Sequence, residues 1–108
     1  MNRGDLASAV LPGPYGSKPR PVLVIQSDEF RNLHSVTVLP LTSEVLPVQV
    51  FRVTVEPTSE NGLIERSQIM VDKAHTLPRH RLGYVFGRAA DKDMMAVNRA
   101  LALFLGLS

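Results

Sequence analysis

Arg20-Pro21-Val22-Leu23-Val24-Ile25-Gln26-Ser27-Asp28 decides the fold of this chain, together with Ser35-Val36-Thr37-Val38-Leu39-Pro40-Leu41-Thr42-Ser43 a little further on. Each stretch is a run of β-branched and apolar residues long enough for a strand. The first is nearly continuously apolar over residues 21–27, which predicts a central strand. If the two runs pair antiparallel, the start of the first lies beside the end of the second. Arg20 and the hydroxyls of Thr42 and Ser43 then become neighbours.

An arginine beside a hydroxyl can form a phosphate site. The guanidinium offers five donors in a fixed fork, and a hydroxyl adds one adjustable hydrogen bond. Taken alone, the pattern leaves a second interpretation open for each residue. Arg20 could form a surface ion pair, and Thr42 or Ser43 could cap a turn at the end of a strand.

Length and composition favour one small domain, residues 1–108, in a reducing cytoplasmic setting. The chain is 44% hydrophobic and has no cysteine, which leaves out disulfides and thiolate chemistry. No apolar run approaches the roughly 18 residues of a membrane span, and Met1–Asp5 does not resemble a signal peptide. The net charge is +2, with nine Arg against three Lys. This preference fits either phosphate binding or a coding bias.

The remaining pattern predicts short antiparallel strands around these two runs. Asn61-Gly62 indicates a tight turn between two of the strands, and the Pro- and Gly-rich residues 12–19 are either a stiff flap over a site or a long hairpin turn. Further strands are expected at residues 5–11, 48–56, 63–71 and 84–87, and a helical turn at 28–32.

The last segment changes to helical spacing, with apolar residues at Met94, Val97, Leu101 and Phe104. Asp91 is the expected N-cap and Gly106 the expected C-terminal stop. Because the helix is apolar on most sides, it is either buried in the barrel or shared with a second subunit. Five or six strands with one C-terminal helix predict a small, strongly bent sheet or partial barrel.

Taken in order and spacing, several motifs resemble the MazF/PemK family of toxin endoribonucleases along nearly the whole chain. The motifs are Arg3-Gly4-Asp5, the two strand runs, Asn61-Gly62-Leu63, Ser67-Gln68-Ile69, Val71-Asp72-Lys73, residues 95–101 and Leu105-Gly106-Leu107. The resemblance implies a homodimeric, SH3-like barrel of the CcdB/MazF type. It implies sequence-specific, metal-independent cleavage of single-stranded RNA, with growth inhibition and silencing by a cognate MazE-like antitoxin. It assigns the catalytic arginine to Arg20 and the catalytic threonine to Thr42.

The chain departs from the family in one loop. Many members have a Gly-Ser-Glu-Gln type sequence before the arginine, whereas Gly13–Lys18 contains no carboxylate. Lys18 could supply a phosphate contact and Tyr15 a stacking ring, or Tyr15 could simply pack the loop. Ser43, Ser67 and Gln68 are further candidate RNA contacts, although Ser67 and Gln68 could instead make the ordinary hydrogen bonds of a strand.

RNA carries its own nucleophile, the 2′-hydroxyl, so an enzyme must remove its proton and stabilise the phosphoryl charge. Arg20 suits the second task, but the general base is not evident. His34, His75 and His80 lie in predicted loops, where solvated histidines are common. His80 sits between Arg79 and Arg81, and this trio is interpreted as a basic RNA or antitoxin contact. The three histidines lack zinc-like spacing, so no metal or cofactor is expected.

Two other functions stay open at this point. The fold is also similar to the CcdB toxins, which poison gyrase without cleaving RNA, although the presence of both Arg20 and Thr42 favours the nuclease. A degenerate toxin kept only as an antitoxin-binding regulator is the other alternative.

Overall fold

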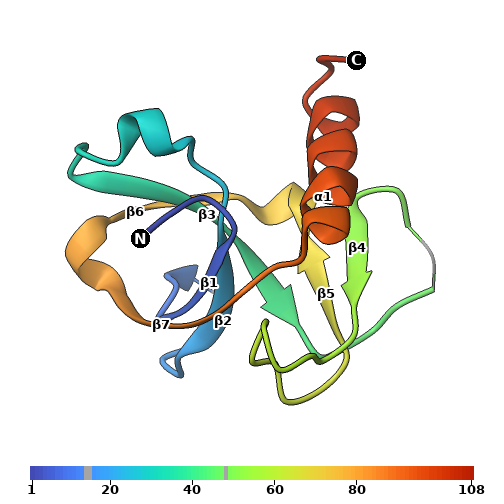
Figure 1. Ribbon diagram of the computed structural model, residues 1–108, viewed down its shortest axis with the longest axis horizontal. Coiled ribbons are helices and arrows are strands. Elements are labelled where there is room, and N and C mark those ends of the chain that lie inside the picture. Colours follow the sequence, from blue (N-terminus) through green and yellow to red (C-terminus); the bar gives the residue numbers. More distant parts are fainter. Residues whose placement is uncertain (14–15, 48) are drawn as a thin grey trace.

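A computed structural model describes residues 1–13, 16–47 and 49–108, and Figure 1 shows the course of the chain. Within these residues, seven strands form a sheet in the order β4-β5-β3-β2-β1-β7, with β6 pairing to β3 off this path. The strands are β1 Asp5–Ala9, β2 Arg20–Val24, β3 Ser35–Thr42, β4 Arg52–Val55, β5 Ser67–Met70, β6 His75–Pro78 and β7 Leu82–Arg88. Short 3-10 turns lie at η2 Asp28–Phe30, η3 Val71–Lys73 and η4 Arg79–Arg81, and α1 is Asp91–Phe104. The mainly β fold with a C-terminal helix is confirmed.

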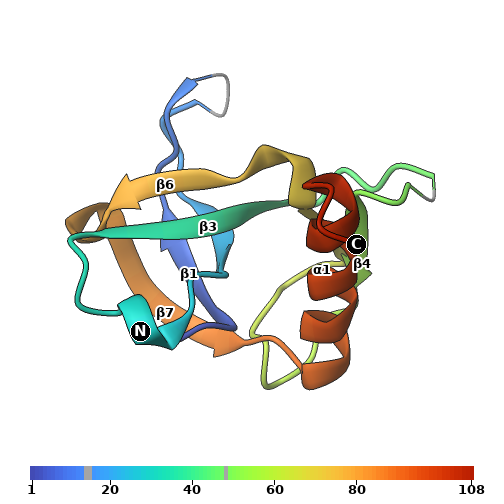
Figure 2. The ribbon, with the colours of Figure 1, turned by 90° about the horizontal axis from the view of Figure 1, so that it is seen from above.

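β3 connects the two halves of the sheet and has the bounds expected from the sequence. On one side it pairs with β2 at Val38–Pro40. On the other side its first half, Ser35–Val38, pairs with β6, and its end, at Leu41 and Thr42, pairs with β5. Pro40 lies between these two stretches, so its missing N–H falls where β3 changes partner. This change of partner bends the sheet into a barrel (Figure 2).

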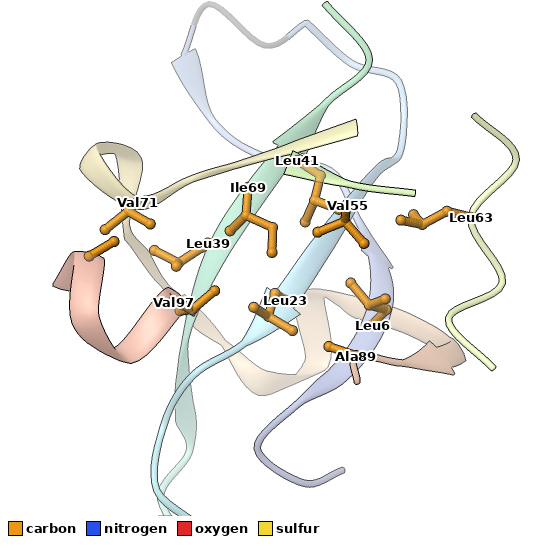
Figure 3. Packing of buried hydrophobic residues seen from close by; sticks show 11 residues of the cluster. Leu6, Leu23, Leu39, Leu41, Val55, Leu63, Ile69, Val71, Ala89 and Val97 are labelled. Carbon is orange, nitrogen blue, oxygen red and sulfur yellow. The ribbon is translucent and has the colours of Figure 1, made fainter. Parts of the chain in front are cut away.

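β2 is buried on both faces, as its continuous apolar run predicted. Successive side chains of a strand point to opposite faces of the sheet. The residues of β2 and β3 are therefore divided between two separate hydrophobic clusters. Val22 and Val24 belong to one cluster, with Val38 of β3. Leu23 belongs to the other cluster, with Leu39 of β3 and Val97 of α1, as Figure 3 shows.

The C-terminal helix is confirmed, but it lies outside the barrel, beside β4 and β5 (Figure 1). Val97 and Ala100 are its buried residues, and Met95 and Leu103 are exposed. Of the two alternatives, burial within the barrel is therefore wrong. No helix among the described residues has both the length and the apolar character needed to cross a bilayer.

Of the two residues expected to end α1, Gly106 at the C-terminus is confirmed and Asp91 as the N-cap is not. Gly106 has φ +75°, and the N–H of Leu107 donates to the carbonyl of Ala102 at 2.7 Å, so the glycine ends the helix. At the other end Ala90 is the N-cap and supplies no side-chain bond, so the prediction for Asp91 is wrong. Asp91 instead lies in the first turn, where a carboxylate favours the positive end of the helix dipole.

Four predicted strands are shorter in the structure, and one strand was missed. The run 5–11 is a strand only at Asp5–Ala9, and the run 21–27 ends as a strand at Val24. The stretch 48–56 is a strand only at Arg52–Val55, and 63–71 only at Ser67–Met70. Asn61-Gly62 is accordingly not a two-residue hairpin turn but part of a long loop, residues 56–66. β6 was not expected from the sequence, and it forms through its ladder with the first half of β3.

Candidate active site

Arg20 and Thr42 come together through the register of β2 and β3. The observed pairs are Val22 with Pro40, Leu23 with Leu39 and Val24 with Val38. The same register, continued by two residues, places Arg20 opposite Thr42. Both residues line one cavity of about 520 Å³. Their predicted proximity is therefore confirmed.

This cavity, called the cleft below, lies where β2 begins and β3 ends. Its walls come from these two strand ends, from the loop 56–66, and from β7. The lining residues are Ser8, Lys18, Pro19, Arg20, Pro21, Leu41, Thr42, Ser43, Gly62, Leu63, Ile64, Glu65, Ser67, Tyr84 and Phe86. The lining thus combines two cations, several hydroxyls, one carboxylate and two aromatic rings.

The Thr42 hydroxyl is oriented by the turn that follows β3. Its Oγ1 accepts a hydrogen bond from the N–H of Glu44 at 3.1 Å. The turn-capping role considered from the sequence is therefore present. A hydroxyl has one proton and two lone pairs, so this bond leaves the proton available to a ligand. Capping and donation to a phosphate are compatible here.

The loop 56–66, part of which lines the cleft, is held by Asn61, which is only 2% exposed. Its Oδ1 accepts from the N–H groups of Thr58 and Leu63, both at 2.9 Å. Its Nδ2 donates to the carbonyl of Glu56 at 2.9 Å. A buried amide with these bonds fixes the backbone of the loop. Asn61 therefore stabilises the conformation of the long loop, whereas the sequence predicted that it forms part of a tight turn.

Two glycines let this loop lie directly on β7. Gly62 has φ +67°, and a Cβ there would lie 2.6 Å from the carbonyl oxygen of Phe86. A Cβ on Gly87 would collide with the backbone of Asn61. Glycine is needed at both positions because the two backbones touch. This contact sets Ile64 and Glu65 at the edge of the cleft.

Ser67 and Gln68, predicted as RNA contacts, are buried. Ser67 lines the cleft, but its hydroxyl donates to the carbonyl of Glu65 at 2.9 Å. Gln68 is 2% exposed. Its Oε1 accepts from the N–H of Leu46 at 3.1 Å, and its Nε2 donates to the Leu46 carbonyl at 2.9 Å and to Thr54 Oγ1 at 3.2 Å. Gln68 therefore holds the loop after β3, and contact with RNA would break these bonds.

The basic trio Arg79, His80 and Arg81 forms η4 and does not line the cleft. Arg79 connects this turn to the residues just before β3. Its Nε donates to the carbonyl of Leu33 at 3.0 Å, and its backbone N–H donates to the carbonyl of His34 at 2.7 Å. Thr42 lies at the other end of the same strand. The RNA contact predicted for the trio stays a prediction, at a place separate from the cleft.

Among the other predicted residues, Lys18 and Ser43 line the cleft, and Tyr15 lies outside the described residues. His34 and His75 do not line it; the Nδ1 of His75 is 2.7 Å from the carbonyl oxygen of Lys73. In the described part of the chain, no group of three or more His, Cys, Asp or Glu residues is placed to hold a metal ion.

Glu65 and Tyr84 are cleft residues that the sequence interpretation missed. The strand predicted over residues 63–71 gives no indication of the exposed position of Glu65. A signal was present: Leu63-Ile64 followed by Glu65-Arg66-Ser67 breaks the alternation of a half-buried strand. Tyr84 is 73% exposed and packs edge-on to Phe86, with the ring centroids 6.2 Å apart. An exposed aromatic ring beside a cationic wall is a surface on which a base can stack.

Comparison with known proteins gives a family and several relatives. The family of the PemK-like, MazF-like toxin of type II toxin–antitoxin systems matches residues 2–105. A protein of Mycolicibacterium smegmatis named probable endoribonuclease MazF is 44% identical over 108 residues, which is all of this chain and 99% of that protein.

Solved structures share the fold over nearly the whole chain. The Mycobacterium tuberculosis toxin MazF-mt6 is 28% identical with a TM-score of 0.82, covering 96% of this chain and 98% of the toxin. An endoribonuclease in complex with its cognate antitoxin, from a mycobacterial species, is 25% identical with a TM-score of 0.83, covering 100% and 97%. With the family match extending over residues 2–105, the chain belongs to the PemK-like, MazF-like toxins of type II toxin–antitoxin systems.

Proposed function

We propose that this protein is a toxin endoribonuclease that cuts single-stranded RNA at short sequences through attack of the 2′-hydroxyl, without a metal ion. The observation that carries the proposal is the placement of Arg20 and Thr42 in one cleft of a chain that belongs to this toxin family. The relatives named endoribonuclease support the same activity. Cutting messenger RNA in the cytoplasm would stop translation and growth.

The chemistry needs stabilisation of charge on the phosphoryl group. When the 2′-oxygen attacks phosphorus, charge builds on the two non-bridging oxygens. The Arg20 guanidinium can donate two parallel hydrogen bonds to them. The Thr42 hydroxyl, already oriented through Glu44, can donate a third. Lys18 on the same wall adds a cation for the flanking phosphates.

Single-stranded RNA fits this cleft better than a duplex does. Bases of a single strand are free to leave the stack and lie on aromatic rings. Tyr84, Phe86 and the 96% exposed Ile64 offer such a surface in the same cleft as Arg20. A base held there would leave its phosphate beside the cationic wall. The arrangement therefore favours an unpaired substrate.

The test is cleavage of a mixed RNA by the purified protein in excess chelator, followed by sequencing of the ends. We expect products with a 2′,3′-cyclic phosphate and a 5′-hydroxyl, at a short common sequence. Cleavage that needs an added divalent ion would overturn the metal-independent mechanism. Growth arrest without any RNA cleavage would instead support the gyrase-directed alternative.

We also propose that the toxin is a homodimer and that a cognate antitoxin binds it. The exposed apolar residues Met95, Leu103 and Phe104 of α1 support a second subunit, and the mycobacterial endoribonuclease solved with its antitoxin supports the second partner. Light scattering at micromolar concentration should give twice the mass of the chain. Leu103→Glu should shift the mass toward one chain, since it places a charge in an apolar interface. A wild-type protein that is monomeric would overturn the dimer.

A further inference from the structure

The proposed reaction lacks a proton acceptor when Arg20 and Thr42 act alone. Attack by the 2′-hydroxyl requires that its proton be removed as the new bond to phosphorus forms. An arginine has no acceptor atom, and a threonine hydroxyl is a weak base. Some other group at the cleft must take the proton, and general-base catalysis typically contributes about 10²–10⁴ in rate.

Glu65 is the carboxylate among the described residues that line the cleft, and no histidine is among them. The three histidines are elsewhere: His34 precedes β3, His75 begins β6, and His80 lies in η4. The other titratable groups lining the cleft are Lys18, Arg20 and Tyr84. Lysine and arginine are cationic donors, and the tyrosine lies on the stacking surface. This leaves Glu65 as the candidate acceptor.

The backbone holds Glu65 near the reacting groups. Ser67 donates its hydroxyl to the Glu65 carbonyl at 2.9 Å, and the loop before it is fixed by Asn61. Glu65 is three residues from Gln68, which pairs with Thr42 in the β3–β5 ladder. Three residues of extended chain reach at most about 10 Å, and Glu65 and Thr42 both line the cleft.

The Glu65 carboxylate has no hydrogen-bond or ion-pair partner in the described part of the chain. Its neighbour Arg66 is engaged elsewhere, because its Nε lies 2.8 Å from the carboxylate of Glu56. A carboxylate with unpaired oxygens can accept a proton from a ligand. A negative charge in a cleft that receives RNA, a polyanion, also weakens RNA binding. A role in RNA binding alone therefore does not explain a carboxylate at this position.

We propose that Glu65 is the general base of the RNA cleavage reaction, an inference that rests on the proposed function. The carboxylate takes the proton of the 2′-hydroxyl while the 2′-oxygen bonds to phosphorus. The bond from phosphorus to the 5′-oxygen breaks, and that oxygen takes a proton from water. Glu65 then releases its proton to solvent. The products are a 2′,3′-cyclic phosphate and a 5′-hydroxyl, with no oxidant or other reactant required.

The test is Glu65→Gln, measured with wild type on one RNA oligonucleotide that wild type cuts, in chelator, across a pH series. We expect kcat to fall about 10²–10⁴-fold, while KM is unchanged or lower because a negative charge has left the cleft. The fall of kcat at acidic pH in wild type should vanish in Glu65→Gln, and Glu65→Asp should recover part of the rate. Glu29→Gln, at an exposed carboxylate in η2, is the matched control and should cut normally.

Three results would overturn this role. In the first, Glu65→Gln cuts the same sequences at the wild-type rate. In the second, it cuts at the wild-type rate but at different sequences. In the third, its rate is lower but depends on pH as the wild-type rate does. The second result would make Glu65 a base-reading residue, because a carboxylate can accept from base amino groups. The outcome is separate from the proposed function: if wild type cuts no RNA, the function itself is wrong, whereas a normal Glu65→Gln enzyme removes only the general base.

Discussion

Arg20, at the first position of β2, lies across the strand ladder from Thr42, at the last position of β3, and both side chains line one cleft. The relationship depends on the antiparallel pairing of two apolar runs whose polar ends meet at one edge of the sheet. The cation and the hydroxyl are therefore carried by rigid elements. A site built this way loses little order when a side chain is truncated, so function and stability can be measured separately.

Arg20→Ala should abolish detectable cleavage while leaving the fold intact. Removing a preorganised donor from a charged transition state costs about 10²–10³ in rate, or roughly 3–4 kcal/mol. Arg20→Lys should also fail largely, since an ammonium lacks the bidentate fork. The measurement is cleavage rate beside melting temperature for each variant. An Arg20→Ala protein that melts and cuts as wild type does would place the site elsewhere.

Thr42→Ser and Thr42→Val should separate the hydroxyl from the methyl group. The serine keeps both the bond from Glu44 and the free proton, so cleavage should stay within a few fold of wild type. The valine keeps the shape but loses the donor, and the rate should fall at least tenfold, which corresponds to about 1.4 kcal/mol. Single-turnover kinetics at saturating RNA gives the comparison. Equal cleavage rates for Thr42→Val and Thr42→Ser would show that the Thr42 hydroxyl does not contact the phosphate.

The sequence predicted most of this arrangement wherever the signal was local or where two strong runs had to pair. Residues 35–42 are a strand because apolar and β-branched residues fill it, and 91–104 is a helix because its apolar residues recur at helical spacing. β6 could not be predicted in this way: His75–Pro78 has one buried apolar residue and is a strand only through its pairing with β3.

The part of the cleft that the sequence did not predict depends on contacts between segments that are far apart in the chain. Glu65 reaches the cleft because the loop 56–66 lies on β7, a contact made possible by Gly62 and Gly87. No periodicity of the loop itself carries that information. The same holds for Gln68, whose polar side chain in a strand suggested an RNA contact. In the structure its side chain bonds to Leu46 on the loop after β3 and to Thr54 of β4, partners that local sequence could not predict.

Gln68→Ala should lower stability rather than change RNA specificity. The change leaves the N–H and carbonyl of Leu46 without the partners that Gln68 provides. Buried polar groups left unpaired cost about 1–3 kcal/mol. Chemical denaturation should show that loss, while Ser43→Ala, on the exposed surface of the same loop, should not. A Gln68→Ala protein with wild-type stability and altered cleavage sequences would instead support the RNA contact predicted from the sequence.

Tyr84→Ala should weaken RNA binding and leave the fold unchanged, because the ring is mostly exposed. Stacking of one base on an aromatic side chain is worth about 1–3 kcal/mol by alanine substitution, so KM should rise roughly 5- to 150-fold with a smaller effect on kcat. Tyr84→Phe keeps the ring and should bind RNA as wild type does. The measurement is KM for a single-stranded oligonucleotide, with the melting temperature as the control for folding. If Tyr84→Phe loses as much as Tyr84→Ala, the phenol hydroxyl rather than the ring contacts the RNA, and the stacking surface proposed in the cleft is wrong.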